Sequence, residues 1–240
     1  MPIRNEIQAD IRKSYYMEYE ELIASQLSFI GKVLSVFSHD INNHLAVLKE
    51  SAGLIGDLIE FGKTSSRKDL KEILKITQSI KNQIEQTAYF CDKLNGFGHG
   101  MEKPLSAFNI HKSIDELTVL LSRFINQKMI CLEKDFTANM PLIYSNPLKI
   151  QFLMFCIIEK HLKRLDKNSR IIIKTVYAND SIGITIIPKG NLIETDEKLI
   201  CNDEIYKHII NQLGVNISHK TSEETTIILP VSLSSSSNRR

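Results

Sequence analysis

The chain has 240 residues, of which 42% are apolar and 24% are charged, and its formal net charge is +2. This composition is typical of a folded globular protein, and it excludes a nucleic-acid binder of the usual kind, which needs a concentrated basic face. No apolar run reaches the roughly 20 residues of a bilayer-spanning helix. Residues 1–21 also lack the apolar segment of a signal peptide. We therefore expect a cytoplasmic protein with no membrane contact and no nucleic-acid partner.

The cysteines give no sign of a metal site. The sequence has four of them, far apart and within apolar patterns, and they form no CxxC motif and no Cys/His cluster: Cys91, Cys131, Cys156 and Cys201. We predict buried free thiols, with neither zinc nor a disulfide framework.

A long amphipathic helix is predicted from about residue 18 to residue 61, where the sequence has no proline. One apolar row repeats every seven residues: Leu27, Leu34, Ile41, Leu48 and Ile55. A second row runs beside it: Ile30, Phe37, His44, Ser51 and Leu58. This spacing is typical of a long helix packed in a bundle.

A second helix is predicted from about residue 66 to residue 94, after a break at residues 62–66. Two long helices with a short connection form an antiparallel hairpin. A lone hairpin leaves an apolar side of each helix uncovered, so we predict that two copies form a homodimeric four-helix bundle. The glycine-rich residues 95–100, followed by Pro104, predict the end of the second helix and a linker.

The remaining sequence predicts a mixture of helices and strands. Helices are expected at residues 110–127, 147–165 and 203–213, and strands at 129–136, 170–177, 181–187, 215–219 and 225–231. Asn146 is the predicted cap of the helix that begins with Pro147. Asn179 and Asp180 predict a hairpin turn, and Gly214 a helix end. We predict an α+β protein with a hairpin domain (1–98), a second domain (107–231) and a flexible tail (232–240).

Residues 37–45 hold the candidate site, because they place a histidine, a carboxylate and an amide within one stretch of helix. With Leu34 and Ile41 at heptad position a, His39 falls at position f, farthest from the packed seam. Asn43 lies one turn later on the same outer face, and Asp40 lies beside the histidine at position g. The carboxylate can select the imidazole tautomer and accept a proton, and the amide can orient a water or a phosphoryl oxygen.

The same outer surface is a candidate docking face for a partner protein. Asn42, Ala46 and Glu50 continue it, and the small Ala46 allows close approach. His44 falls at position d, facing the seam, and we expect it to be a polar core residue or to make an interhelical hydrogen bond. His39 and His44 do not share a helical face, so they are not expected to bind a metal together.

Residues 38–45, SHDINNHL, resemble the motif of the histidine-kinase dimerisation and phosphoacceptor domain (HisKA type), in which Glu or Asp follows the histidine and Asn or Thr comes four residues after it. The resemblance implies that His39 is the phosphoacceptor, that Asp40 assists proton removal and that Asn43 positions water. His44 replaces the usual proline. Residues 109–130, 140–150 and 225–230 are similar to parts of the family's GHKL-like ATP-binding domain.

The second domain departs from the family in three places. Cys156 and Lys160 stand where the resemblance implies two asparagines that hold magnesium and nucleotide phosphates. Residues 188–192, PKGNL, replace the adenine-binding Asp-x-Gly-x-Gly, and residues 201–204, CNDE, replace a second glycine loop. We therefore expect a degenerate α/β sandwich domain that binds no cofactor.

The favoured function is a histidine phosphotransferase of a two-component phosphorelay. It would pass phosphoryl groups between the Asp of a response-regulator receiver domain and His39 without ATP, with magnesium supplied by the receiver. Two alternatives stay open: a non-catalytic pseudokinase or adaptor that dimerises and binds response regulators, and a divergent active histidine kinase. A metal-dependent phosphohydrolase of the HD type is a weaker alternative, since the other ligands have no recognisable place.

Overall fold

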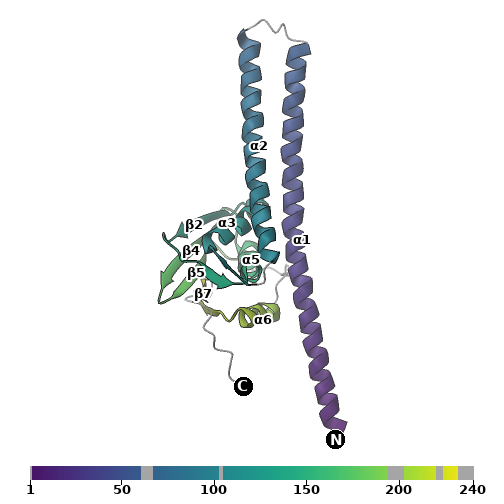
Figure 1. Cartoon of the computed structure of the whole chain (residues 1–240), viewed down its shortest axis with the longest axis vertical. Helices are drawn as coiled ribbons and strands as arrows, with labels where there is room; N and C mark the ends of the chain where they lie inside the picture. The colour runs from purple at the N-terminus through teal and green to yellow at the C-terminus, as the bar shows by residue number, and fades with distance from the viewer. Residues whose placement is uncertain (1, 61–66, 103–104, 194–202, 220–223, 232–240) are drawn as a thin grey trace.

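The structure is a computed structural model, and it describes residues 2–60, 67–102, 105–193, 203–219 and 224–231, with side chains from Tyr19 onward. It is an α+β fold in which a long helical hairpin is followed by an α/β sandwich (Figure 1). The sandwich packs beside the part of the hairpin where α2 ends. The predicted fold class is confirmed in this respect, and the predicted tail at 232–240 lies outside the described residues.

The hairpin consists of α1 (Pro2–Glu60) and α2 (Arg67–Glu102), which lie side by side over most of the length of α2. The second predicted heptad row, from Ile30 to Leu58, is half-buried against α2. Phe37 in this row stacks on Phe90 of α2, with ring centroids 5.4 Å apart. The second row of the predicted heptad pattern is therefore confirmed, whereas Leu27 and Leu34 of the first row are exposed, and α1 begins well before residue 18. The predicted break at residues 62–66 lies outside the described residues.

The prediction that residues 95–100 form a linker is wrong, because these residues are helical and α2 continues to Glu102. Packing explains why a glycine-rich segment stays helical. A Cβ at Gly96 would collide with the carboxylate of Glu116, on the helix that packs against this part of α2. The glycine therefore lets the two helices approach closely, and the tertiary contact outweighs its poor intrinsic helix propensity.

The sandwich has a five-stranded sheet in the order β2-β4-β5-β7-β6. The strands are β2 (Cys131–Phe136), β4 (Arg170–Ala178), β5 (Ser181–Lys189), β6 (Asn216–His219) and β7 (Thr225–Pro230). β2 runs parallel to β4, and the other neighbouring pairs are antiparallel. Asn179 and Asp180 link β4 to β5 with φ of 51° and 52°, as a two-residue type I′ hairpin turn requires. The predicted hairpin is confirmed.

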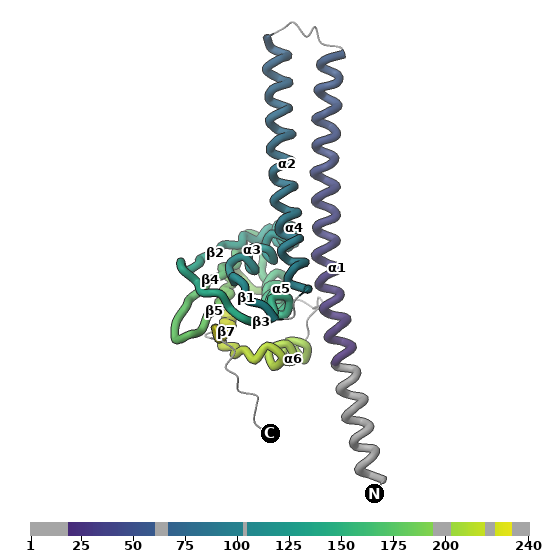
Figure 2. Tube along the Cα trace, in the orientation of Figure 1, coloured from purple at the N-terminus to yellow at the C-terminus, as the bar shows by residue number. Residues whose placement is uncertain are grey.

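Four helices accompany this sheet: α3 (Ile110–Leu120), α4 (Ser122–Gln127), α5 (Pro147–Arg164) and α6 (Asp203–Leu213). Helices α3, α4 and α5 lie between the sheet and the hairpin (Figure 2). The side chain of Asn146 accepts a hydrogen bond from the backbone N–H of Lys149 at 2.9 Å, so the predicted cap of α5 is confirmed. Gly214, with φ of 62°, ends α6 as predicted.

A second, two-stranded sheet was not predicted from the sequence. It pairs β1 (Ser106–Phe108) with β3 (Ile143–Ser145) in antiparallel register. Each strand has only three residues, which is too short to produce a clear alternating pattern. β1 directly precedes α3 in the chain, and β3 directly precedes α5.

An aromatic cluster joins the sandwich to α1. The ring of Phe29 lies 5.7 Å from that of Phe97 on α2, and 5.6 Å and 4.7 Å from those of Phe152 and Phe155 on α5. Phe29 has no exposed surface, so this contact is part of the main hydrophobic core. The buried side chains that α1 contributes to this core end at Val36, three residues before His39.

The cysteines differ in exposure. Cys156 is buried and Cys91 is half-buried, but Cys131, at the start of β2, is exposed. The prediction of buried thiols is thus wrong for Cys131, which lies at the edge of the sheet rather than within it. Cys201 lies outside the described residues.

One described helical stretch, residues 19–60 of α1, has the length and apolar composition of a membrane-spanning helix. Lys32 and Asp40 interrupt this stretch, so it holds no continuous apolar run of about 20 residues, as expected. The stretch is also amphipathic, with polar side chains around His39 on one face, and a bundle helix meets the same criterion. Cytoplasmic location and the absence of membrane contact stay predictions.

Candidate functional site

His39 lies on the outside of α1, where its side chain is 45% exposed. The heptad prediction that this side chain points away from the packed seam is confirmed. The sandwich contacts α1 at Phe29 and Lys32, so His39 lies about two turns beyond Lys32 along the helix.

Both predicted neighbours of His39 contact the same ring nitrogen. Nδ1 lies 3.1 Å from Oδ1 of Asp40 and 3.1 Å from Nδ2 of Asn43. A neutral imidazole carries one proton, so Nδ1 either donates to the carboxylate or accepts from the amide. Rotation of the Asn43 amide by half a turn would present its oxygen and allow both neighbours to accept from Nδ1–H. In that arrangement Nε2 carries the lone pair.

Asp40 is well placed to favour this tautomer. Its side chain is 24% exposed, less than that of the histidine, and its oxygen holds a short contact to Nδ1. A carboxylate beside Nδ1 stabilises the Nδ1–H form and any positive charge that develops on the ring. Among the described residues, the hydrogen bonds of His39 are made through Nδ1, and Nε2 makes none.

The three residues predicted as a docking face are all exposed: Asn42, Ala46 and Glu50. They lie on the same side of α1 as His39 and Asn43, within three turns, as the helical period requires. The structure therefore groups all six predicted residues, from His39 to Glu50, on one accessible surface. Their roles stay predictions.

His44 points the other way. Its Nδ1 lies 3.0 Å from Oγ1 of Thr87 on α2, and its ring approaches the edge of Phe90. The prediction of an interhelical hydrogen bond is confirmed. His39 and His44 do not converge, and no cluster of three or more potential metal ligands occurs among the described residues.

The positions that the resemblance assigns to nucleotide binding carry different chemistry. Cys156 is buried in the core and Lys160 is exposed. Their side chains end in sulfur and nitrogen, so neither supplies an oxygen ligand for magnesium. Gly190 has φ of 147°, and a Cβ there would collide with the side chain of Ser169. The backbone conformation after β5 therefore requires glycine at this position, and no role in nucleotide binding is needed to explain it. Residues 194–202 lie outside the described residues.

The sequence analysis missed a cluster of charges between the two parts of the molecule. Glu159 on α5 is 3% exposed, and its Oε1 lies 3.2 Å from Nζ of Lys32 on α1 and 3.3 Å from Nζ of Lys163. The pair Glu159 and Lys163 is visible as an i, i+4 spacing on a helix. The contact with Lys32 spans 127 residues and has no sequence signal.

No known protein family and no curated protein sequence matches this chain. Among solved structures it is similar to the histidine kinase AdeS of Acinetobacter baumannii, with 14% identity, a TM-score of 0.43, and coverage of 80% of this chain and 98% of that one. It is also similar to the histidine kinase ThkA in complex with the response regulator protein TrrA, with 17% identity, a TM-score of 0.45, and coverage of 89% and 66%.

The isolated catalytic domain of ThkA gives a TM-score of 0.45 at 14% identity, and covers 54% of this chain and 97% of that one. The chain is thus similar to histidine kinases in architecture.

Proposed function

We propose that this chain is a histidine phosphotransferase, which receives a phosphoryl group on Nε2 of His39 from the aspartate of a response-regulator receiver domain and passes it to another. The observation that carries this proposal is the arrangement at His39. Asp40 and Asn43 both engage Nδ1, while Nε2 has no hydrogen-bond partner among the described residues and the side chain is 45% exposed.

The transfer follows from this geometry. The Nε2 lone pair attacks phosphorus as the P–O bond to the receiver's aspartate breaks, and the aspartate leaves as a carboxylate. The N–P bond places positive charge on the ring, which the neighbouring Asp40 carboxylate stabilises, and Nδ1 keeps its proton or passes it to that carboxylate. The same steps in reverse transfer the phosphoryl group from His39 to the aspartate of a second receiver domain. Magnesium bound by the receiver would neutralise the phosphoryl oxygens.

The second domain supports a donor other than ATP. Cys156 is buried and uncharged as a thiol, and Lys160 places a cation where an oxygen ligand for Mg²⁺ is needed. We infer that this domain no longer binds nucleotide and instead supports the hairpin, through the packing of Phe29 against Phe152 and Phe155.

The exposed apolar side chains of the hairpin support a homodimer. On α1, Leu27, Leu34, Leu45 and Ile59 form a stripe that the sandwich and α2 leave uncovered, and on α2 the matching residues are Leu70, Leu74 and Ile84. A second copy of the hairpin would cover both stripes and complete a four-helix bundle.

Transfer of label tests the proposal. The purified chain is mixed either with radiolabelled ATP and Mg²⁺ or with receiver domains labelled on aspartate. We expect label on the chain from a receiver only, and its loss in His39→Ala. The matched control is His99→Ala, because His99 is also exposed and paired with a carboxylate, at 3.3 Å from Glu102. Labelling from ATP alone would indicate an active kinase, and no label from any of several receivers would indicate an adaptor.

A further inference from the structure

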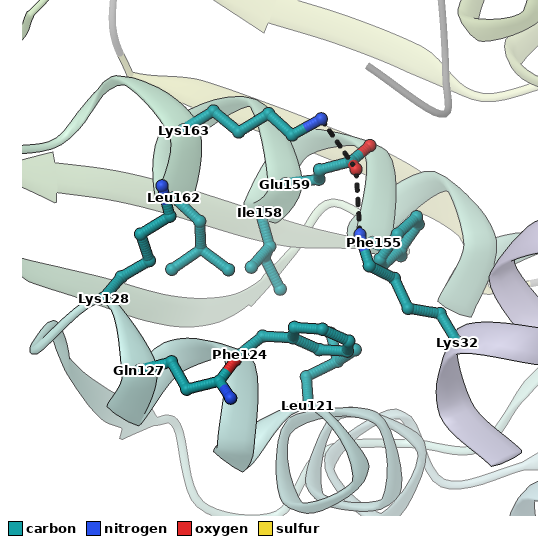
Figure 3. A pocket seen from close by; sticks show the side chains of 10 residues that line it. All are labelled: Lys32, Leu121, Phe124, Gln127, Lys128, Phe155, Ile158, Glu159, Leu162 and Lys163. Carbon is teal, nitrogen blue, oxygen red and sulfur yellow. Dashed lines mark hydrogen bonds and ion pairs between the residues drawn. The ribbon is translucent and has the colours of Figure 1, made fainter. Parts of the chain in front are cut away.

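A pocket of about 260 Å³ lies where α1, α4 and α5 meet. Figure 3 shows Ile158 and Leu162 of α5 facing Phe124 of α4 across it. Leu121 and Phe155 complete the apolar part of the wall. This volume is just below the roughly 300 Å³ at which sites for drug-sized molecules begin, so the pocket suits a smaller molecule with an apolar body.

The polar part of the wall is mainly cationic. Lys32, Lys128 and Lys163 line the pocket together with a single carboxylate, that of Glu159. Lys32 and Lys163 both contact the same oxygen of that carboxylate, so three ammonium groups share the wall with one carboxylate. Nζ of Lys32 also lies 4.8 Å from the centre of the Phe124 ring, which keeps this ammonium beside the apolar wall.

We propose that this pocket binds a small amphipathic anion, a molecule with one carboxylate or comparable anionic group on a short apolar body. The apolar body would lie between Phe124, Ile158 and Leu162. The anionic group would lie among the ammonium groups of Lys32, Lys128 and Lys163, which attract it. Burial of apolar surface supplies most of the affinity, and the charge selects anions over neutral molecules.

This pocket is separate from the positions that the family resemblance assigns to nucleotide binding and from His39. Cys156 and Lys160 do not line the pocket. Lys32 lies seven residues before His39 on the same side of α1, which is two turns or about 10 Å along the helix axis. Because the pocket wall includes both α1 and α5, a bound anion would strengthen the packing of the sandwich on α1. The inference goes beyond the proposed function and does not depend on it.

Octanoate is a suitable probe, with 1-octanol as its uncharged counterpart, and binding to the full chain can be measured by isothermal titration calorimetry. We expect saturable binding of one octanoate per chain and at least tenfold weaker binding of octanol. Lys128→Glu should weaken octanoate binding at least tenfold. Lys167→Glu is the matched control, because Lys167 is exposed on the same domain but does not line the pocket. It should bind octanoate as the wild type does.

A measurement on the wild-type protein does not depend on how the variants fold. Nuclear Overhauser contacts are expected between the octanoate chain and the methyl groups of Ile158 and Leu162. The proposal is overturned if octanoate shows no saturable binding, if octanol binds equally well, if the two lysine variants weaken binding equally, or if these methyl contacts are absent.

Discussion

Asn43 places its amide nitrogen 3.1 Å from Nδ1 of His39, one turn earlier on the same face of α1. Asp40 approaches that nitrogen at the same distance. The two neighbours therefore act on one atom, and together they decide which ring nitrogen carries the proton. A site built for phosphoryl transfer needs Nε2 unprotonated and accessible, and an Nδ1–H donor to Asp40 provides this state.

Asp40→Asn should slow phosphoryl transfer from a receiver to His39 by about 100-fold or more, the usual size of a general-base contribution. The amide keeps the size of the side chain but cannot stabilise positive charge on the ring. Rapid-quench measurement of labelled protein would determine the rate. Glu102→Gln, at the other exposed His–carboxylate pair, should leave the rate unchanged. Equal rates for Asp40→Asn and wild type would contradict the role of this carboxylate.

Asn43→Ala should prolong the lifetime of phosphohistidine by on the order of tenfold, the effect of losing one hydrogen bond that orients water. Uptake of the phosphoryl group should change less, because Asp40 still holds the imidazole. The decay of isolated, labelled protein measures the lifetime. A large loss of uptake with an unchanged lifetime would instead assign Asn43 to the transfer step.

Ile84→Glu should convert a dimer into monomers. Ile84 is 53% exposed on the uncovered stripe of α2, and each subunit would lose roughly 1.5–3 kcal/mol of apolar burial and acquire a buried charge. The dissociation constant should rise by at least about 100-fold. Sedimentation equilibrium measures it, and Gln86→Glu, exposed on another side of α2, is the control. If wild type is itself monomeric, the four-helix bundle is wrong.

Gly96→Ala and Gly98→Ala should have opposite effects on stability, although both glycines lie in α2. A Cβ at Gly96 would collide with Glu116, so we expect a loss of about 1–3 kcal/mol. Gly98 has open space around it, so alanine should gain up to about 1 kcal/mol from helix propensity. Urea unfolding followed by circular dichroism measures both. Equal changes would show that residues 95–100 are not packed as described.

Stability should fall in mild acid because of His161. This side chain is 4% exposed, and burial, with Lys160 and Arg164 nearby, lowers its pKa to about 4 from 6.5. Between these values the unfolded chain binds the proton and the folded chain does not, so stability is lost as the pH falls from 6.5 toward 4. Over this whole range the free energy of unfolding should fall by about 3 kcal/mol because of His161.

His161→Leu isolates this contribution. Neither ring nitrogen of His161 has a hydrogen-bond partner within the part of the chain that the structure describes, so leucine leaves no polar group unpaired. The urea midpoint of the variant should vary less between pH 7 and pH 5 than that of wild type. Burial raises the pKa of Glu116, so protonation of this carboxyl increases stability as the pH falls, which is opposite to the effect of His161. Glu116 makes this contribution in both the wild type and the variant. An unchanged pH dependence would rule out His161 as the source.

The direction of His39 could be predicted from the sequence because a helix converts spacing into angle. Once Phe37 and Ile41 define the packed side of α1, the outward position of His39 and the inward position of His44 follow from the 3.6-residue period. Local signals also sufficed for the cap at Asn146 and for the turn at Asn179 and Asp180. Each of these features depends on residues within a turn or two of one another.

Features that depend on distant residues were decided only by the tertiary structure. The glycines of residues 95–100 predict a break, but packing of α2 against Glu116 and its neighbours keeps them helical. The pairing of β1 with β3 joins short segments whose sequences carry no alternation. The contact of Lys32 with Glu159, and the cationic pocket around it, exists because the fold brings together groups 127 residues apart, and no local preference encodes such a distance.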